Sequence, residues 1–259
     1  MAKNITGKCR FCGKHKKFIE AHIIPAAFSR DVVKRKGDGK TLIEVSKKQG
    51  GKIVQSNGYR DLNILCGGCD GILGAYEGAL IVFLRDSKNI SRYNYRKINI
   101  AIKGILWKAH ITSRPEFKDI NLGKYGDKLY ESLKSSIEVL DSTPPQDFPI
   151  WICRYKNDLG TENNKSDILY NMISCGSRGR DYYHGTLYRF DFTGHQIIIR
   201  VGGESLPQYI NRFINIEKPN IYEIRYTYNG IQYIYNGSKV DMKNTKISIL
   251  EYLTQAILY

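Results

Sequence analysis

The stretch CRFCGKHKKFIEAHIIP, residues 9–25, opens with two cysteines separated by two residues, and a second pair with this spacing, CGGC, occupies residues 66–69. The spacing lets both thiolates of a pair reach one tetrahedral Zn²⁺, at about 2.3 Å per Zn–S bond. Two such pairs predict a closed, structural zinc site in preference to redox-active cysteines. The predicted ligands are Cys9, Cys12, Cys66 and Cys69.

The remaining cysteines have a different setting. Cys153 and Cys175 lie in apolar, strand-like runs, so we interpret them as core residues. Six cysteines, four of them in two Cys-X-X-Cys pairs, fit a reducing compartment and a metal better than a disulfide framework. The start MAKNITGKCR is polar, and no apolar run reaches the roughly 18 residues of a membrane span. We therefore expect a cytoplasmic protein without membrane contact.

Composition and charge narrow the function. The chain has 259 residues, 42% of them hydrophobic, which is enough to build cores and argues against disorder. Its net charge is +15, and residues 1–60 hold 15 Lys and Arg against four Asp and Glu. A basic surface of this kind favours a polyanionic partner, because each cation set against a phosphate releases counterions. The alternative is a merely solubilising surface.

The segment between the cysteine pairs predicts two short strands. His22 lies in the apolar run IEAHIIP, which Pro25 ends, and the chain returns to the second pair through GYRDLNILC. Asp70 follows the second pair directly. The stretch ILGAYEGAL then predicts a helix with one face formed by Leu73, Tyr76, Glu77 and Leu80.

Residues 7–85 resemble the HNH endonucleases of the ββα-metal, treble-clef type. The likeness depends on CRFC, EAHIIP, DLNILC and the Cys-Asp step at Asp70. In that family the strand histidine is the general base that deprotonates water, and one divalent cation, usually Mg²⁺, stabilises the leaving oxygen. The resemblance implies that His22 is the base and that Asp70 binds Mg²⁺ or Mn²⁺. An imidazole with an ordinary pKa near 6.5 suits this role, and a carboxylate is a hard donor for Mg²⁺.

Two positions of the family pattern are ambiguous here. The supporting residue before the second cysteine pair is either Asp61, which we favour as the carboxylate orienting His22, or Asn63. Many members carry Asp or His just before the base as a second metal ligand, where this chain has Ala21. Glu20 would point to the opposite face of a strand, and Glu77 lies two helical turns beyond Asp70. Either the cation has fewer protein ligands and water molecules complete its coordination shell, or the protein has lost cleavage and has kept nucleic-acid binding.

Several other polar residues are candidates for contact with nucleic acid. Those expected to grip the DNA backbone are Lys14, Lys16, Lys17 and Arg60. His15 is expected to be exposed or to contact phosphate. His110, His184 and His195 have no partner that spacing reveals. In SRGRDYYHG, residues 177–185, an arginine and Asp181 are expected to brace a turn.

The chain beyond residue 88 is expected to form two further parts. Residues 89–145 predict two helices. The basic run SRYNYRK either presents phosphate contacts and stacking faces to nucleic acid or is a solvated start of the first helix, which stops before Arg114. The second helix presents Tyr130, Leu133, Ile137 and Leu140 on one face and ends at the Pro144–Pro145 pair. Residues 146–259 predict an α+β domain with an antiparallel sheet, each strand having one wet face. Its expected strands are PIWICRY, DILYNMISC, TLYRFDF, HQIIIRV, NIYEIRYTY and IQYIYNG, and its expected helices are LPQYINRFI and ISILEYLTQAIL.

The overall prediction is an α+β chain with a zinc-binding nuclease module at residues 1–88, a helical segment at 89–145 and a domain at 146–259 for target recognition, partner docking or homo-oligomer formation. The predicted function is metal-dependent hydrolysis of DNA phosphodiester bonds. The family's members often serve in phages, mobile elements or defence against phages. The alternatives are a non-catalytic treble-clef protein that binds nucleic acid and a zinc module that only scaffolds a partner.

Overall fold

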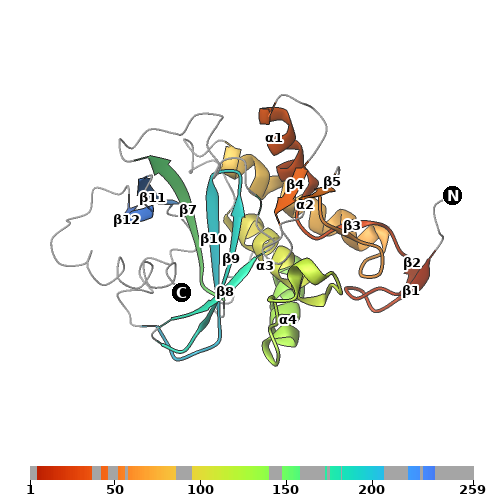
Figure 1. Ribbon diagram of the computed structural model, residues 1–259. Helices are drawn as coiled ribbons and strands as arrows, with labels where there is room; N and C mark the ends of the chain where they lie inside the picture. Colours follow the sequence, from red (N-terminus) through yellow and green to blue (C-terminus); the bar gives the residue numbers. More distant parts are fainter. Residues whose placement is uncertain are drawn as a thin grey trace.

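A computed structural model describes residues 5–36, 42–45, 52–55, 58–85, 95–139, 148–157, 173, 176–181, 183–206, 221–227 and 230–236. Its fold is mixed α+β, as predicted, with short N-terminal strands at one end, helices in the middle and the large sheet at the other end (Figure 1). The helices of the described part are α1 (Ala26–Lys36), α2 (Gly67–Arg85), α3 (Tyr95–Ile111) and α4 (Tyr125–Glu138).

The N-terminal end is built from pairs of short antiparallel strands. β1 (Thr6–Lys8) pairs with β2 (His15–Lys17), and the first cysteine pair lies in the turn between them. β3 (Ala21–His22) pairs with β6 (Arg60–Asp61), and α2 starts at the second cysteine pair. The predicted order of His22 strand, return strand and helix is therefore confirmed. Between them, β4 (Leu42–Val45) pairs with β5 (Lys52–Gln55).

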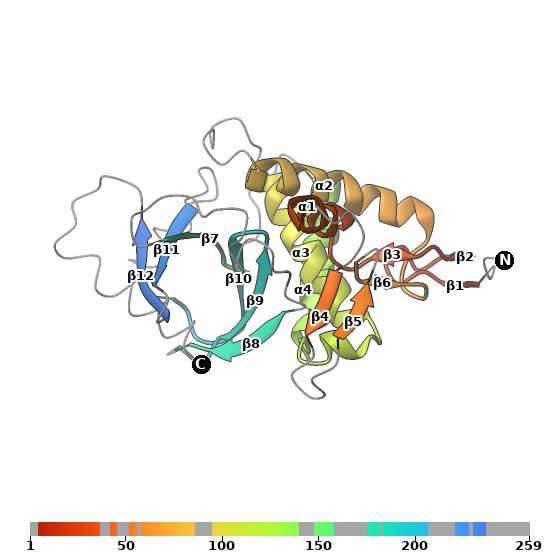
Figure 2. The same ribbon diagram turned by 45° about the horizontal axis from the view of Figure 1, so that its top comes forward.

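Helix α3 is the central helix, lying between α2 and α4 in both ribbon views (Figures 1 and 2). Every residue from Ile98 to Ala109 is buried. A helix that is enclosed on all sides needs apolar residues all round, which its sequence INIAIKGILWKA largely provides. The helix stops before Arg114, as predicted, and a 3₁₀ turn (Pro115–Phe117) follows.

Helix α4 is amphipathic, as predicted. It buries Leu129 and Leu133 and leaves Tyr130 and Ile137 partly buried against the core. Leu140 and the Pro144–Pro145 pair lie outside the described residues.

One sheet of six strands, in the order β12-β11-β7-β10-β9-β8, forms the other end of the molecule. The strands are β7 (Ile150–Asn157), β8 (Ser177–Arg180), β9 (Thr186–Phe192), β10 (His195–Val201), β11 (Ile221–Thr227) and β12 (Gly230–Asn236). β7, β10 and β9 pair antiparallel, as predicted. β8 also pairs antiparallel, with β9, although residues 177–180 were expected to belong to a loop. Thr193 and Gly194 form the expected tight turn between β9 and β10, with φ of 46° and 88°. β11 and β12 form the predicted hairpin.

Two expectations for this sheet are wrong. β11 pairs parallel with β7, because the pattern within a strand does not specify the direction of its neighbour. All seven residues of β10 are buried, so this strand has no wet face. It is an inner strand of a sheet that is strongly curved in Figure 2, with helices on one side and the inside of the curve on the other.

Some predicted elements fall largely outside the described residues. Of the strand DILYNMISC only Ile173 is described, in an isolated bridge with Phe192. The predicted helices LPQYINRFI and ISILEYLTQAIL lie outside, apart from buried Leu206.

One continuous set of buried side chains connects all three parts of the chain. Phe28 of α1 stacks on Phe192 of β9, with ring centroids 4.7 Å apart and an interplanar angle of 4°. The core thus crosses the expected boundaries at residues 88 and 145, and the division into domains stays a prediction.

Among the described residues, α2 is long and apolar enough to cross a membrane by length and composition alone, which the sequence analysis did not expect. A third of its apolar window, 33%, is buried inside the structure. A core helix of a globular protein can pass the same test of length and hydropathy. This helix also carries Cys69 and the buried side chain of Glu77.

Candidate functional site

The two cysteine pairs meet at one point. The Sγ atoms of Cys9, Cys12, Cys66 and Cys69 all lie within 4.8 Å of one another. The first pair sits in a tight knuckle in which the Gly13 N–H donates to the Cys9 carbonyl at 2.9 Å, and Gly13 has a φ of 70° that favours glycine. Four convergent thiols with two closely spaced pairs fit a tetrahedral Zn²⁺, so the predicted zinc site is consistent with the structure.

The environment of the cluster already favours a thiolate at one position. Burial alone would raise the pKa of Cys9, but N–H groups of Cys12, Cys66 and Phe11 and the Cys12 thiol lower it to about 7. One of these donors, the Cys66 N–H, lies 3.4 Å from the Cys9 Sγ. Burial raises the pKa of Cys69, and its neighbouring thiols raise it further. A bound cation would offset this cost, because metal ligands bind as thiolates.

An aromatic cluster fixes the first knuckle to the helices. The Phe11 ring lies 5.5 Å from the Trp107 ring of α3 and 5.8 Å from the Tyr130 ring of α4, edge-on to both. The Tyr130 hydroxyl donates to the Phe11 carbonyl at 2.5 Å. Such ring pairs contribute about 0.5–1.5 kcal/mol each beyond area burial. The zinc knuckle is therefore held rigidly against α3 and α4.

His22 is half-buried on β3, directly opposite Arg60 of β6. The neighbouring pair, Ala21 and Asp61, projects to the other face of this two-stranded ladder, because side chains alternate along a strand. The His22 carbonyl accepts a hydrogen bond from the Lys108 ammonium of α3. β3 is thereby joined to β6 on one side and to α3 on the other.

Glu77, which was considered as a second metal ligand, forms an ion pair with Lys108 of α3. Its carboxylate lies 2.5 Å from the Lys108 Nζ, and both side chains are almost completely buried. Burial raises the pKa of Glu77, Lys108 opposes this, and the charge of Asp70 adds to it. Glu77 is therefore committed to an ion pair rather than available to a divalent cation.

The Asp61 carboxylate forms its hydrogen bonds in the described part of the chain with Thr112 and Asn63. Its Oδ2 accepts a hydrogen bond from the Thr112 hydroxyl at 2.5 Å, and its Oδ1 accepts one from the Asn63 N–H at 2.8 Å. The buried carboxylate thus connects β6 to the end of α3. These contacts give no support to the interpretation that Asp61 orients His22, and the Asn63 side chain is exposed.

Asp70 lies in the first turn of α2 and is half-buried. A carboxylate is favoured there by the helix dipole. No hydrogen bond or ion pair of its side chain is present among the described residues, although its charge acts on Glu77. Of the three acidic candidates for a cation, Asp70 is the one whose carboxylate is not engaged by another residue of the described part.

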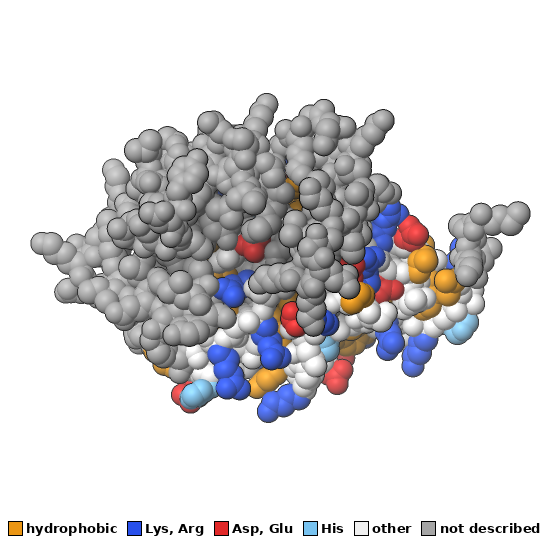
Figure 3. Space-filling view, viewed as in Figure 1, with side chains coloured by type: hydrophobic (Ala, Val, Ile, Leu, Met, Phe, Trp, Pro, Cys, Tyr) orange, Lys and Arg blue, Asp and Glu red, His pale blue; other side chains and the backbone are white. Residues whose placement is uncertain are grey.

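The predicted phosphate-gripping residues divide into two groups. Lys14, Lys16 and Lys17 are exposed on the β1–β2 hairpin, and no ion pair engages them in the described part of the chain. Lys and Arg side chains are visible along this end of the molecule in Figure 3. Arg60 instead forms an ion pair with Glu20. His15 on β2 is exposed, in line with the prediction.

The other histidines and the 177–185 loop have structural surroundings. The His110 Nδ1 accepts the Leu122 N–H at 3.3 Å. The turn-bracing role of Asp181 is confirmed, but its arginine partner is Arg200, 2.6 Å away, and not an arginine of the loop. His184 lies 3.7 Å from Glu204, both exposed.

The Arg154 Nε donates to the His195 ring at 3.2 Å. Cys153 is fully buried, as predicted, and Cys175 lies outside the described residues.

Lys108 and Thr112 were not predicted as functional residues from the sequence. Lys108 could have been found as a charge within the largely apolar helix α3, since a buried ammonium requires a partner. Thr112, just beyond that helix, carried no signal of its own.

Comparison with protein-family models, with curated proteins and with solved structures found no match to this chain.

Proposed function

We propose that this protein is a metal-dependent endonuclease of the HNH type, hydrolysing DNA phosphodiester bonds beside a structural zinc. The observation that supports this most directly is the order of parts around the cysteine cluster. A strand that carries His22, its antiparallel partner and a helix that opens with Asp70 follow one another between and after the knuckles.

His22 is the proposed general base. Its imidazole lies on a short strand whose backbone is fixed from two sides, by β6 and by Lys108. A fixed backbone limits the movement of the ring, and proton abstraction depends on the position of the base within hydrogen-bond reach of water. A half-buried imidazole can still meet a water molecule and a phosphodiester from the solvent side.

Asp70 is the proposed ligand of the catalytic cation. Its carboxylate is a hard oxygen donor without another described partner, which fits Mg²⁺ or Mn²⁺. When bound, the cation supplies positive charge where the leaving oxygen becomes negative. Glu77 does not fit as a second ligand because Lys108 holds it, and Ala21 has no donor atom. Water would have to complete the coordination shell.

DNA contact is proposed along the β1–β2 hairpin, where Lys14, Lys16 and Lys17 are exposed. Their charges would bind the phosphodiester backbone without reading base sequence. Arg60 would contribute only if it released Glu20.

A second candidate is a zinc protein that binds nucleic acid without cleaving it. The ion pair between Glu77 and Lys108, together with the methyl group of Ala21, favours this candidate. Both features reduce the number of carboxylates available to a catalytic cation.

Nicking of supercoiled plasmid in the presence of Mg²⁺ or Mn²⁺ tests the proposal. We expect wild-type protein to nick, His22→Asn and Asp70→Asn to lose at least about 10²-fold in rate, and His184→Asn, which changes an exposed histidine elsewhere, to match wild type. Equal nicking by wild type and His22→Asn would contradict the proposal. Salt-sensitive gel shifts by a wild-type protein that never nicks would establish the second candidate instead.

A further inference from the structure

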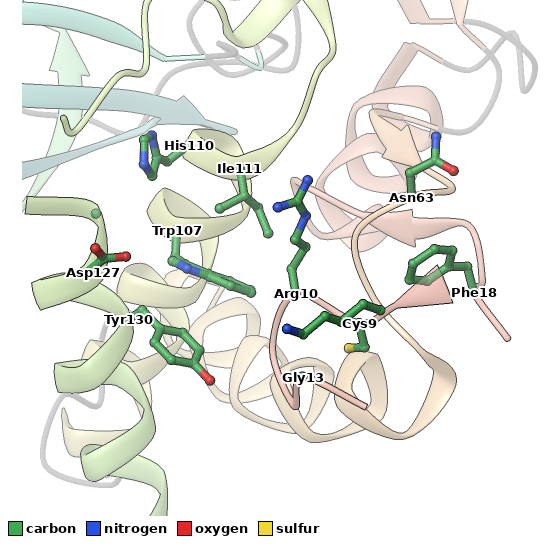
Figure 4. Close-up of a pocket in the computed structure, with 12 residues that line it drawn as sticks. Cys9, Arg10, Gly13, Phe18, Asn63, Trp107, His110, Ile111, Asp127 and Tyr130 are labelled. Atoms are coloured by element: carbon green, nitrogen blue, oxygen red, sulfur yellow. The ribbon is translucent and has the colours of Figure 1, made fainter. Parts of the chain in front are cut away.

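A cavity of about 630 Å³ lies between the first zinc knuckle and helices α3 and α4. In Figure 4 Arg10 and Asn63 come from the zinc-binding end, and Trp107 and His110 of α3 lie across from them. His22 and Asp70 do not line the cavity, and of the residues considered for the catalytic site only Asn63, the alternative to Asp61, does. It is therefore a site separate from the proposed catalytic residues.

The wall formed by the knuckle is positively charged. Lys8 and Arg10 line the cavity, and both side chains are exposed. Neither forms an ion pair or side-chain hydrogen bond with any residue in the described ranges. The lining contains a single carboxylate, Asp127, so the two cations leave an excess of positive charge that points to an anionic ligand.

The backbone around Lys8 and Arg10 is held by hydrogen bonds and ring contacts. The Arg10 N–H donates to the Ile64 carbonyl at 3.0 Å, and the Cys9 N–H donates to the Lys14 carbonyl at 3.0 Å. Phe11, next in the chain, packs edge-on against Trp107 of α3 and Tyr130 of α4. Because these hydrogen bonds and ring contacts hold the backbone, an anion that binds has to order only the two side chains.

The opposite wall is polar. The His110 Nδ1 accepts the Leu122 N–H, so in the neutral ring the Nε2 carries the proton. Asp127 of α4 offers a carboxylate without a described partner, and Asn63 on the knuckle side offers an exposed side-chain amide. The cavity is larger than a phosphate group needs and falls in the usual size range of sites for small organic ligands.

We propose that this cavity binds one nucleotide unit, with its phosphate between Lys8 and Arg10 and its nucleoside along the wall that contains His110. Two sources share this chemistry, a nucleotide within a DNA strand and a free mononucleotide. The choice of nucleotide over other organic phosphates rests on the proposed function. The site itself requires no cleavage and no catalytic cation.

The two tryptophans of the chain give a direct readout of location. Trp107 lines the cavity, whereas Trp151 is buried in β7 away from it. We would titrate ¹⁵N-tryptophan-labelled, zinc-loaded protein with thymidine 5′-monophosphate and, separately, with a short oligothymidylate, assigning the indole signals with Trp151→Phe. We expect the Trp107 signal to shift and the Trp151 signal to stay.

The outcomes separate the sources. A shift with the oligonucleotide at far lower concentration assigns the site to a strand, and a shift with the monophosphate alone assigns it to a free nucleotide. No shift of the Trp107 signal with either probe at millimolar concentration overturns the proposal.

A charge-matched pair of variants tests the phosphate contacts. We expect Lys8→Gln/Arg10→Gln to weaken binding of the same probe about tenfold or more and to flatten its salt dependence by about 0.7 per lost phosphate contact. Arg30→Gln/Lys118→Gln removes two exposed cations elsewhere and should change affinity by less than about twofold. Equal weakening by both double variants would overturn the proposal.

Failure here is distinguishable from failure of the nuclease proposal. His22→Asn should retain the Trp107 shift and the affinity of wild type, because it leaves the cavity lining unchanged. If wild type nicks plasmid but the Trp107 signal does not move, the cavity proposal alone fails.

Discussion

The ammonium of Lys108 and the carboxylate of Glu77 form an ion pair 2.5 Å long in the core, with side-chain exposures of 1% and 9%. Lys108 also donates to the carbonyl of His22. One buried charge thus connects α3, α2 and the strand of the proposed base. Removing two ions from water is costly, and this arrangement is stable only while both partners are present.

Loss of one partner should therefore cost more than loss of both. We expect Lys108→Met to lower the free energy of unfolding by about 3–5 kcal/mol, because Glu77 is left buried and unpaired. Lys108→Met/Glu77→Leu should recover most of that loss. Urea unfolding of wild type, the two single variants and the double variant completes the cycle. A double variant as unstable as the sum of the singles would show that the two side chains do not act as a pair.

The same carboxyl group predicts a pH dependence. Burial raises the pKa of Glu77 above its ordinary 4.5, so between that value and its raised pKa the folded protein binds more protons than the unfolded chain. Stability then falls as pH rises through this window, by at most about 1.4 kcal/mol per pH unit. The stability of wild type minus that of Glu77→Gln should fall from pH 5 upward, measured by urea unfolding. A difference that rises with pH would contradict the assigned direction.

Local spacing was sufficient to predict much of the N-terminal end. Two Cys-X-X-Cys pairs predicted the cluster, and a proline-ended apolar run followed by a return segment predicted the β3–β6 ladder. These features depend on residues close in the chain and on one ion that joins them. The turn at Thr193 and Gly194 was predictable for the same reason, because glycine readily adopts the positive φ of its second position.

Partners distant in the chain were not predictable. Glu77 was considered as a second metal ligand although it lies two helical turns from Asp70, and its position does not reveal an ammonium that arrives from another helix, 31 residues away. Asp61 was assigned to His22, yet the Thr112 hydroxyl reaches it from beyond α3. Periodicity predicts which face of an element is buried and not which polar group it meets there.

We expect zinc to be essential for the folding of the N-terminal end. Zinc binding should not depend on Cys153, the other cysteine of the described part. We expect purified protein to hold one zinc per chain and Cys66→Ser to lose it, with a large loss of thermal stability, because metal binding to such sites is worth about 10–16 kcal/mol. Cys153→Ser, the same substitution at a buried cysteine of β7, should keep the zinc and cost about 1–3 kcal/mol for the buried hydroxyl. Metal analysis after dialysis and thermal unfolding measure both. Zinc retained in full by Cys66→Ser would contradict the four-thiolate assignment.

Glycines in two helices should respond oppositely to alanine. A Cβ at Gly126, near the start of α4, would lie 2.5 Å from the His110 Nε2, whereas a Cβ at Gly78 of α2 would meet nothing within 4 Å. Gly126→Ala must displace an imidazole that is held by the Leu122 N–H, and we expect it to cost about 1–3 kcal/mol. Gly78→Ala should stabilise by about 0.5–1 kcal/mol, because alanine loses less backbone entropy in a helix. Urea unfolding decides, and a stabilising Gly126→Ala would mean that the His110 ring does not lie against α4.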